Sequence, residues 1–221
     1  PLNNTSLTSH ISTLKARGLK VEHDDIPSDI VTFKDANLEQ AIRDALGIPT
    51  ELLKKEDLAK LEELVVDGGY SWDPKLAEEE QVKDLTGLEY CTGLQLLNLR
   101  NHQISDISAL ATLTKLSNID LSFNQLSEVG ALANLTELKK LELMDNQVSD
   151  ITPLTDLTNL TNLSLSGNPL NAAAYTTVIP ALQARGVSVT FDPPTNQAPV
   201  ANDQSITVGE NLPQHPITLS A

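Results

Sequence analysis

The sequence has few aromatic residues, one cysteine and a shortage of positive charge. Only 3% of its 221 residues are aromatic although 40% are hydrophobic, so a core must be built from Leu, Ile, Val and Ala. The single Cys91 excludes a disulfide within the chain and a CxxC metal pair. The formal net charge of −15 disfavours nucleic acid and anionic lipid surfaces as partners. No apolar run approaches the ~18 residues of a membrane-spanning helix, so we expect no membrane insertion.

What the sequence does contain is a repeat of 22 residues. The first leucine of the pattern LxxLxLxxNxIxDIxxLxxLxx recurs at Leu94, Leu116, Leu138 and Leu160, and the other apolar positions keep the same step. The alternating LxL part predicts a short strand with one face turned inward. A single copy cannot bury its leucines, whereas stacked copies form a parallel sheet over a continuous core. The repeat therefore predicts an α/β solenoid with one parallel strand in each copy.

An irregular copy precedes the four regular ones. Leu61, Leu64 and Val66 supply its strand positions, and its later apolar positions begin at Val82. Val66 and Val82 are 16 residues apart where the regular step is 5, so about 11 residues are inserted. We expect the insertion, residues 67–81, to project near the concave rim, because repeat insertions usually map to one face of a solenoid.

Polar residues recur at fixed positions in the repeat. An asparagine stands where a strand turns outward, at Asn124, Asn146 and Asn168. Its amide can bond backbone groups of adjacent turns. His102 holds this position in the first regular copy, and we expect its ring nitrogens to replace the amide. Cys91 fills a leucine position and is predicted to be a buried hydrophobe. Asp106 and Asp150 recur with the repeat, which favours hydrogen bonding in turns over acid–base catalysis.

The two ends of the repeat array have sequences of a different type, as the caps of a solenoid require. An amphipathic stretch between Asp35 and Gly47 predicts a helix, with one face formed by Leu38, Ala41, Ile42, Ala45 and Leu46. A second short helix is expected over residues 56–60. After the repeats, helical spacing between residues 175 and 182 ends at Gly186, and a strand is expected over residues 187–191.

The first residues of the chain repeat the C-terminal cap at an offset of 168, beginning with Pro1-Leu2-Asn3 against Pro169-Leu170-Asn171. We therefore expect residues 1–26 to be the cap remnant of a preceding repeat domain, and the chain to derive from a larger multi-module protein. The expected organisation after that remnant is a repeat domain over 27–192, with a cap over 27–60, an irregular copy over 61–93, regular copies over 94–170 and a C-terminal cap over 171–192, then a linker over 193–199 and the start of a truncated β-domain over 200–221.

The 22-residue pattern closely resembles the internalin-type bacterial leucine-rich repeats, and IVTFKDANLEQAIRDALG resembles their N-terminal helical cap. The resemblance implies a right-handed leucine-rich-repeat solenoid with a curved parallel sheet on its concave face. It also implies a secreted or cell-surface bacterial protein, often an adhesin, whose concave face binds other proteins. The tail NQAPVANDQSITVGENLP resembles the start of a bacterial immunoglobulin- or cadherin-like domain, for which weak calcium binding is implied by the resemblance alone. The small number of repeats, the insertion and His102 depart from the family.

Binding residues are expected at the third, fifth, seventh and eighth positions of LxxLxLxxN, which project from the concave face or its rim. Ser122 and Ser164 fall on these rows, and so do the residues of the expected binding surface, Leu96, Asn98, Arg100, Asn118, Asp120, Phe123, Lys140, Glu142 and Met144. Arg, Phe and Met are residue types enriched in interfaces. Tyr70 and Trp72 form a second candidate in the insertion, unless Trp72 folds back onto the core or the cap.

Three kinds of function remain open: a protein-binding adhesin module, a structural spacer in a surface stalk, and an accessory domain of a secreted enzyme. Catalysis within the chain is not expected, because no GxSxG, HExxH, P-loop or dinucleotide motif occurs and the four histidines are scattered. We expect a monomer without cofactor or metal, whose partner is a protein or alternatively a glycan.

Overall fold

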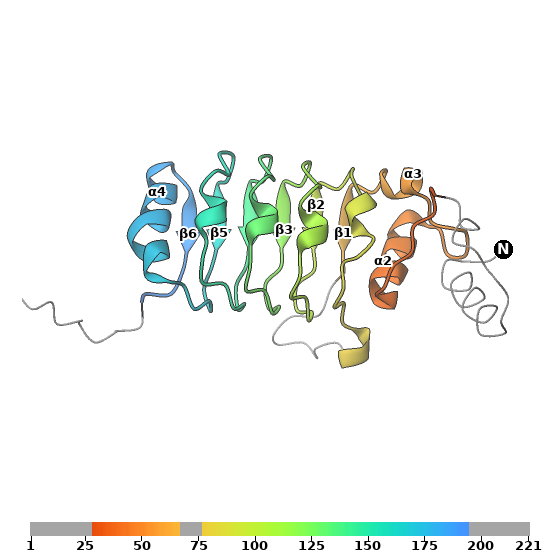
Figure 1. Ribbon diagram of the computed structural model, residues 1–221, viewed down its shortest axis with the longest axis horizontal. Helices are drawn as coiled ribbons and strands as arrows, with labels where there is room; N and C mark the ends of the chain where they lie inside the picture. Colours follow the sequence, from red (N-terminus) through yellow and green to blue (C-terminus); the bar gives the residue numbers. More distant parts are fainter. Residues whose placement is uncertain (1–27, 67–76, 195–221) are drawn as a thin grey trace, which may run out of the picture.

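The computed structural model describes residues 28–66 and 77–194. Its centre is a sheet of parallel strands stacked in sequence order, with helices at both ends of the row (Figure 1). The strands are β1 (Glu63–Val65), β2 (Leu96–Asn98), β3 (Asn118–Asp120), β4 (Lys140–Glu142), β5 (Asn162–Ser164) and β6 (Ser188–Thr190). The irregular copy supplies β1, the four regular copies supply β2 to β5, and the C-terminal cap supplies β6. This arrangement confirms the predicted solenoid with a curved parallel sheet.

The register of the sheet follows the repeat. Leu97 pairs with Ile119, which is the residue 22 positions later, and the same step continues through β5. The opposite side of the turns consists of short 3-10 segments, η3 (Leu88–Tyr90), η4 (Ser108–Leu110), η5 (Gly130–Leu132) and η6 (Thr152–Leu154). The repeated leucines, isoleucines and valines are buried between the two sides, and Cys91 lies among them in a leucine position as predicted.

Asparagine side chains bond each turn to the one before it. Asn124 Oδ1 accepts from the Ile104 N–H at 3.0 Å, and its Nδ2 donates to the Leu99 carbonyl at 2.8 Å, 25 residues earlier. Asn146 and Asn168 form the same pair of bonds one and two repeats later. Because these groups are buried, the amides satisfy backbone atoms that would otherwise have lost their water partners.

His102 replaces the amide at the insertion. Its Nδ1 accepts from the Val82 N–H at 3.2 Å, so Nε2 carries the ring proton and donates to the Val66 carbonyl at 3.1 Å. Val66 lies 36 residues before His102, whereas Leu99 lies 25 residues before Asn124. The difference of 11 residues equals the length of the insertion. The predicted replacement is therefore confirmed. The described end of the insertion forms η2 (Glu78–Glu80), outside the row of turns (Figure 1).

The N-terminal cap consists of α2 (Ala36–Leu46) and α3 (Lys55–Leu58). Asp35 Oδ1 caps α2 at the Asn37 and Leu38 N–H groups, while Oδ2 accepts from the Lys83 N–H at 2.7 Å and so ties the cap to the irregular copy. The second helix is shorter than the predicted 56–60 and begins one residue earlier, at Lys55.

The buried side of α2 differs from the predicted apolar face. Ala45 is exposed, whereas Glu39 and Arg43 are buried. The two residues form an ion pair at 2.8 Å, and Arg43 also donates to the Ile48 and Glu51 carbonyls. An amphipathic pattern assigns such charges to solvent, but a mutually paired and hydrogen-bonded pair can be buried.

The C-terminal cap begins with η7 (Ala174–Val178), a π-helical segment, and continues as α4 (Ile179–Ala184). Gly186 follows with φ of 90°, a left-handed conformation that ends the helix as predicted. Arg185 then donates to the carbonyls of Thr155 and Leu157 in the last complete turn. The cap is thus joined to the solenoid by side-chain hydrogen bonds as well as by the β5–β6 pairing.

Candidate functional site

The concave face consists of the outward residues of the strands. In each of β1 to β4 the middle residue is buried, while the first and third residues are exposed or half-buried. The nine residues predicted from the repeat positions are all at least partly accessible, and we call them the central patch: Leu96, Asn98, Arg100, Asn118, Asp120, Phe123, Lys140, Glu142 and Met144. Six of them line a shallow hollow of about 170 Å³ on the sheet.

Two other residues of the predicted rows do not project. Ser122 is fully buried and Ser164 is 8% exposed. Ser122 is at the seventh position, after the strand, whereas Ser164 ends β5 and its hydroxyl accepts from Thr190 Oγ1 of β6 at 3.3 Å. Val65, at the fifth position of the irregular copy, is 57% exposed and extends the concave face onto β1. Tyr70 and Trp72 lie outside the described residues.

Arg100 links the strand part of the central patch to its rim. The Arg100 guanidinium carbon lies 4.5 Å from the centre of the Phe123 ring, a cation–π contact. One guanidinium nitrogen lies 3.9 Å from Asp120 Oδ2. The Asp120 carboxylate is itself held in place, because its Oδ1 accepts a hydrogen bond from the Ser122 N–H at 2.9 Å. The strand-to-rim turn therefore fixes the carboxylate that orients the arginine.

The rim has an unusual backbone. The eighth position of each regular repeat is left-handed, with φ of 61° at Asn101, 58° at Phe123, 50° at Asp145 and 76° at Gly167. Asn, Asp and Gly are the residue types that tolerate this conformation, whereas a bulky side chain there is an outlier. The recurrence of Asn, Asp and Gly at this position could have identified the left-handed turn from the sequence.

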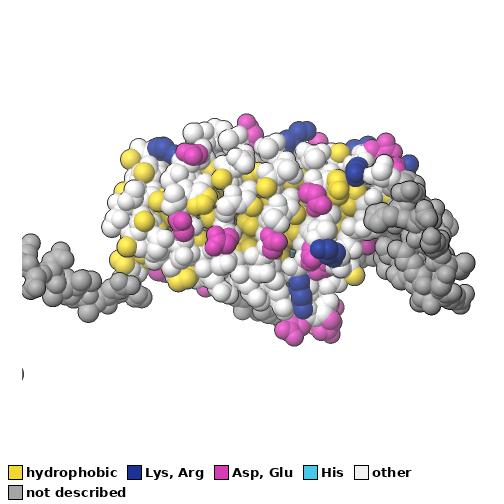
Figure 2. Space-filling model, viewed as in Figure 1, with side chains coloured by type: hydrophobic (Ala, Val, Ile, Leu, Met, Phe, Trp, Pro, Cys, Tyr) yellow, Lys and Arg dark blue, Asp and Glu magenta, His cyan; other side chains and the backbone are white. Residues whose placement is uncertain are grey.

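The charges of the central patch are arranged in pairs. Lys140 Nζ lies 3.0 Å from Glu142 Oε1, and Arg100 faces Asp120. Elsewhere, acidic side chains are scattered over the face of the molecule shown in Figure 2, as the net charge of −15 requires. The central patch therefore offers both signs of charge, together with apolar groups, on a surface that is otherwise mainly acidic.

Beside the patch lies a hollow of about 360 Å³, which we call the rim groove. Its lining comes from the rim and from the described end of the insertion: Glu78, Asn101, His102, Gln103, Phe123, Asn124, Gln125 and Asp145. Gln103 Nε2 donates to Glu78 Oε1 at 3.4 Å, which connects the two walls. Phe123 thus belongs both to the central patch and to the rim groove.

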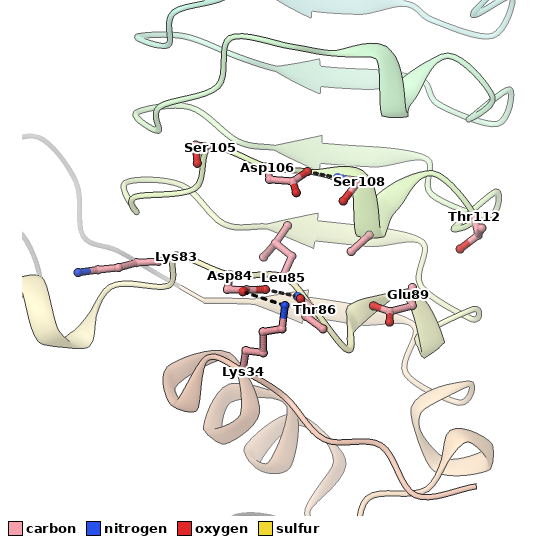
Figure 3. Close-up of a pocket in the computed structure, with 11 residues that line it drawn as sticks. Lys34, Lys83, Asp84, Leu85, Thr86, Glu89, Ser105, Asp106, Ser108 and Thr112 are labelled. Carbon is pink, nitrogen blue, oxygen red and sulfur yellow. Dashed lines mark hydrogen bonds and ion pairs between the residues drawn. The ribbon is translucent and has the colours of Figure 1, made fainter. Parts of the chain in front are cut away.

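A larger hollow, of about 490 Å³, lies where the N-terminal cap meets the first turns (Figure 3). At this hollow, Lys34 Nζ lies 3.8 Å from Asp84 Oδ2. Two of its carboxylates hold local turns, because Asp84 accepts from the Thr86 N–H and Asp106 from the Ser108 N–H, both at 2.8 Å. The bond of Asp106, and the matching bond from the Thr152 N–H to Asp150 Oδ1 at 2.8 Å, confirm the turn role predicted for these two aspartates.

The cysteine of the described residues is buried. Burial raises the pKa of Cys91 to about 12, with a smaller contribution from Glu89, so the thiol is protonated at neutral pH. Among residues 28–66 and 77–194, no group of three or more His, Cys, Asp or Glu side chains could hold a metal ion. No helix in the same ranges has the length and apolar character of a membrane span.

Comparison with known proteins identifies the repeats. Residues 77–185 match the family model for the repeats of leucine-rich repeat and WD repeat-containing protein 1. The crystal structure of an internalin, inlF, from Listeria monocytogenes aligns with a TM-score of 0.54 and 27% identity over 73% of this chain. Internalin C2 of the same species gives a TM-score of 0.36 and 20% identity, over 76% of this chain and 100% of that one. A leucine-rich-repeat protein of Leptospira interrogans gives a TM-score of 0.49 and 23% identity, over 61% of this chain and 38% of that one. No curated protein matches.

The chain therefore has the leucine-rich-repeat solenoid fold that its repeat pattern predicted, and it is similar to an internalin. It spans about half of the inlF structure, 52% of that chain. The predicted immunoglobulin- or cadherin-like start at 200–221 and the cap remnant at 1–26 lie outside the described residues.

Proposed function

We propose that this chain is a protein-binding module of a secreted or cell-surface bacterial protein, with an adhesive role, and that the central patch is its binding surface. The observation that carries the proposal is Phe123. A non-glycine residue in the left-handed region costs of order 1–3 kcal/mol, and such strain tends to persist at functional sites. The neighbouring copies place Asn101, Asp145 and Gly167 at the same position. An aromatic ring kept there at this cost is best explained by a contact that the ring makes.

The surroundings of Phe123 support the same reading. Arg and aromatic residues dominate the energetics of protein interfaces, and here they are stacked on each other before any partner binds. The Asp120 carboxylate holds Arg100 in place, so less side-chain entropy is lost when the patch is covered. The paired charges of Lys140 and Glu142 favour a partner with a mixed polar surface over a strongly basic one.

The resemblance to internalins supports the location and the class of partner, since that resemblance implies surface-exposed proteins that bind through the concave face. A structural spacer, or an accessory domain of a secreted enzyme, would not need an organised concave patch. The two alternatives therefore differ from the proposal in what they predict for substitutions on this face.

The test is capture of biotinylated cell-surface proteins by the immobilised 221-residue chain. Arg100→Ala should reduce the captured partner at least tenfold, about 1.4 kcal/mol, because it removes the stacked cation at the centre of the patch. Lys115→Ala is the matched control, since it removes an exposed cation that is not in the patch. Equal capture by all three proteins would exclude the patch, and the absence of any partner would favour the spacer.

A further inference from the structure

The rim groove has a composition unlike that of the central patch. Apart from the buried Asn124 and His102, which bond the backbone, its wall carries the carboxamides of Asn101, Gln103 and Gln125 and the carboxylates of Glu78 and Asp145. Phe123 contributes one aromatic ring, and no lysine or arginine lines the groove within the described residues. The walls hold many hydrogen-bonding atoms and almost no apolar area apart from this ring.

We propose that the rim groove binds a neutral saccharide. Carboxamides both donate and accept hydrogen bonds, and carboxylates accept them, which suits the adjacent hydroxyl groups of a sugar. The negative face of an aromatic ring attracts the weakly positive C–H groups of a pyranose. The saccharide site is separate from the protein-binding role of the central patch, although the two surfaces share Phe123.

Other classes of ligand fit the groove less well. An anion, such as a phosphate or a sulfated glycan, would meet Glu78 and Asp145 without a cation in the lining. An apolar ligand would bury amides and carboxylates without partners, which is unfavourable. A cationic peptide would be attracted by the two carboxylates, but Glu78 and Asp145 are exposed, so salt screens that attraction.

The repeat supplies a matched pair of variants. Gln125 and Gln147 hold the same position in successive copies, and both are exposed. Gln125 lines the rim groove and Gln147 does not. Their backbone N–H groups make the same bond to the preceding turn, to the Ile104 and Leu126 carbonyls. Any difference between Gln125→Ala and Gln147→Ala therefore reports on the groove rather than on the fold.

The experiment is saturation-transfer NMR, followed by titration, on the 221-residue chain. The probes are cellotetraose and chitotetraose as neutral saccharides, a heparin tetrasaccharide as an anion, and penta-lysine as a cation. We expect a neutral tetrasaccharide to bind with millimolar affinity. Gln125→Ala should weaken its binding about fivefold, the effect of one hydrogen bond, and Phe123→Asn should weaken it further. Gln147→Ala and the patch variant Lys140→Ala should bind like the unmodified chain.

The outcomes separate the two proposals. Saccharide binding that survives Lys140→Ala, a change within the central patch, would place the saccharide away from that part of the patch. Three results would overturn the saccharide site: no neutral probe binds, penta-lysine or heparin binds instead, or Gln125→Ala and Gln147→Ala act alike. None of these results would bear on the capture of a protein by the central patch, which is judged by Arg100→Ala and Lys115→Ala.

Discussion

Replacing Asn146 by alanine should remove about 3 kcal/mol from the free energy of unfolding, because the amide joins two turns of the solenoid. Its Oδ1 is the acceptor for the Leu126 N–H at 3.0 Å, and its Nδ2 donates to the Leu121 and Leu143 carbonyls at 2.9 and 3.1 Å. Both carbonyls keep another amide partner, from Asn124 and Asn168. The Leu126 N–H loses its acceptor in a buried position, which costs about 2 kcal/mol, and the weakened carbonyl bonds account for about 1 kcal/mol more.

Urea unfolding followed by circular dichroism measures this loss. With a slope of about 2 kcal/mol per molar urea, the midpoint should fall by about 1.5 M while the slope stays constant. Gln147→Ala is the control. Gln147 follows Asn146 in the same repeat but its side chain is exposed, so its removal should change the free energy of unfolding by less than about 0.5 kcal/mol. A loss below about 1 kcal/mol for Asn146→Ala, or equal losses for the two variants, would refute the role of the asparagine ladder.

Three further predictions concern buried or hydrogen-bonded ionisable groups. Arg43→Met should lower the free energy of unfolding, measured in urea, by about 3–5 kcal/mol, because Glu39 remains buried without its cation. Adding Glu39→Leu should restore most of that loss. An Arg43→Met variant as stable as the unmodified chain would contradict this prediction. Cys91 should resist iodoacetamide at pH 8 until urea unfolds the chain, and rapid labelling of the native chain would count against its burial. The free energy of unfolding should also fall as the pH rises above the ordinary thiol pKa of 9.0. There the folded thiol, with a pKa of about 12, stays protonated while the unfolded thiol ionises. Hydrogen bonds from the side chain and backbone of Thr86 lower the pKa of Asp84, and those of Thr152 lower the pKa of Asp150. Both carboxylates therefore contribute stability that is present above pH 3.8 and lost as the pH falls through the lowered pKa values. In the double variant Asp84→Asn and Asp150→Asn, the urea midpoint should fall less steeply between pH 5 and 2, and an unchanged pH dependence would be evidence against these turns.

The features of the fold that could be predicted are those imposed equally on every copy of the repeat. A leucine at a fixed step has to face inward in all copies or in none, so the strands, the core and the position of Cys91 could be inferred together. The hydrogen bonds of His102 followed from the same reasoning, because the backbone groups it meets exist in every turn. The nine residues of the central patch could be placed on the concave face for this reason as well.

The features that could not be predicted depend on a single neighbour. Ser122 is buried at a position where Arg100 and Met144, one copy away on either side, are half-buried. The Glu39–Arg43 pair is buried because Arg43 also finds two carbonyls beyond the end of α2. At Phe123 the sequence shows an aromatic residue where other copies have Asn, Asp or Gly, but the backbone angle is needed to show that Phe123 keeps the left-handed conformation rather than relaxing out of it. A repeat pattern describes the average turn, and such details are departures from that average.

The insertion shows how a solenoid accepts such a departure without losing its core. The extra residues enter between Val66 and Val82, and both of these residues are bonded by the same imidazole ring, so the first complete turn is closed across the insertion. The regular copies close each turn with an amide that bonds the same two kinds of backbone group. The register of β1 against β2 therefore continues the register of the regular copies. Glu78 at the described end of the insertion and Phe123 on the rim line one groove, so these two departures from the repeat meet where saccharide binding is proposed.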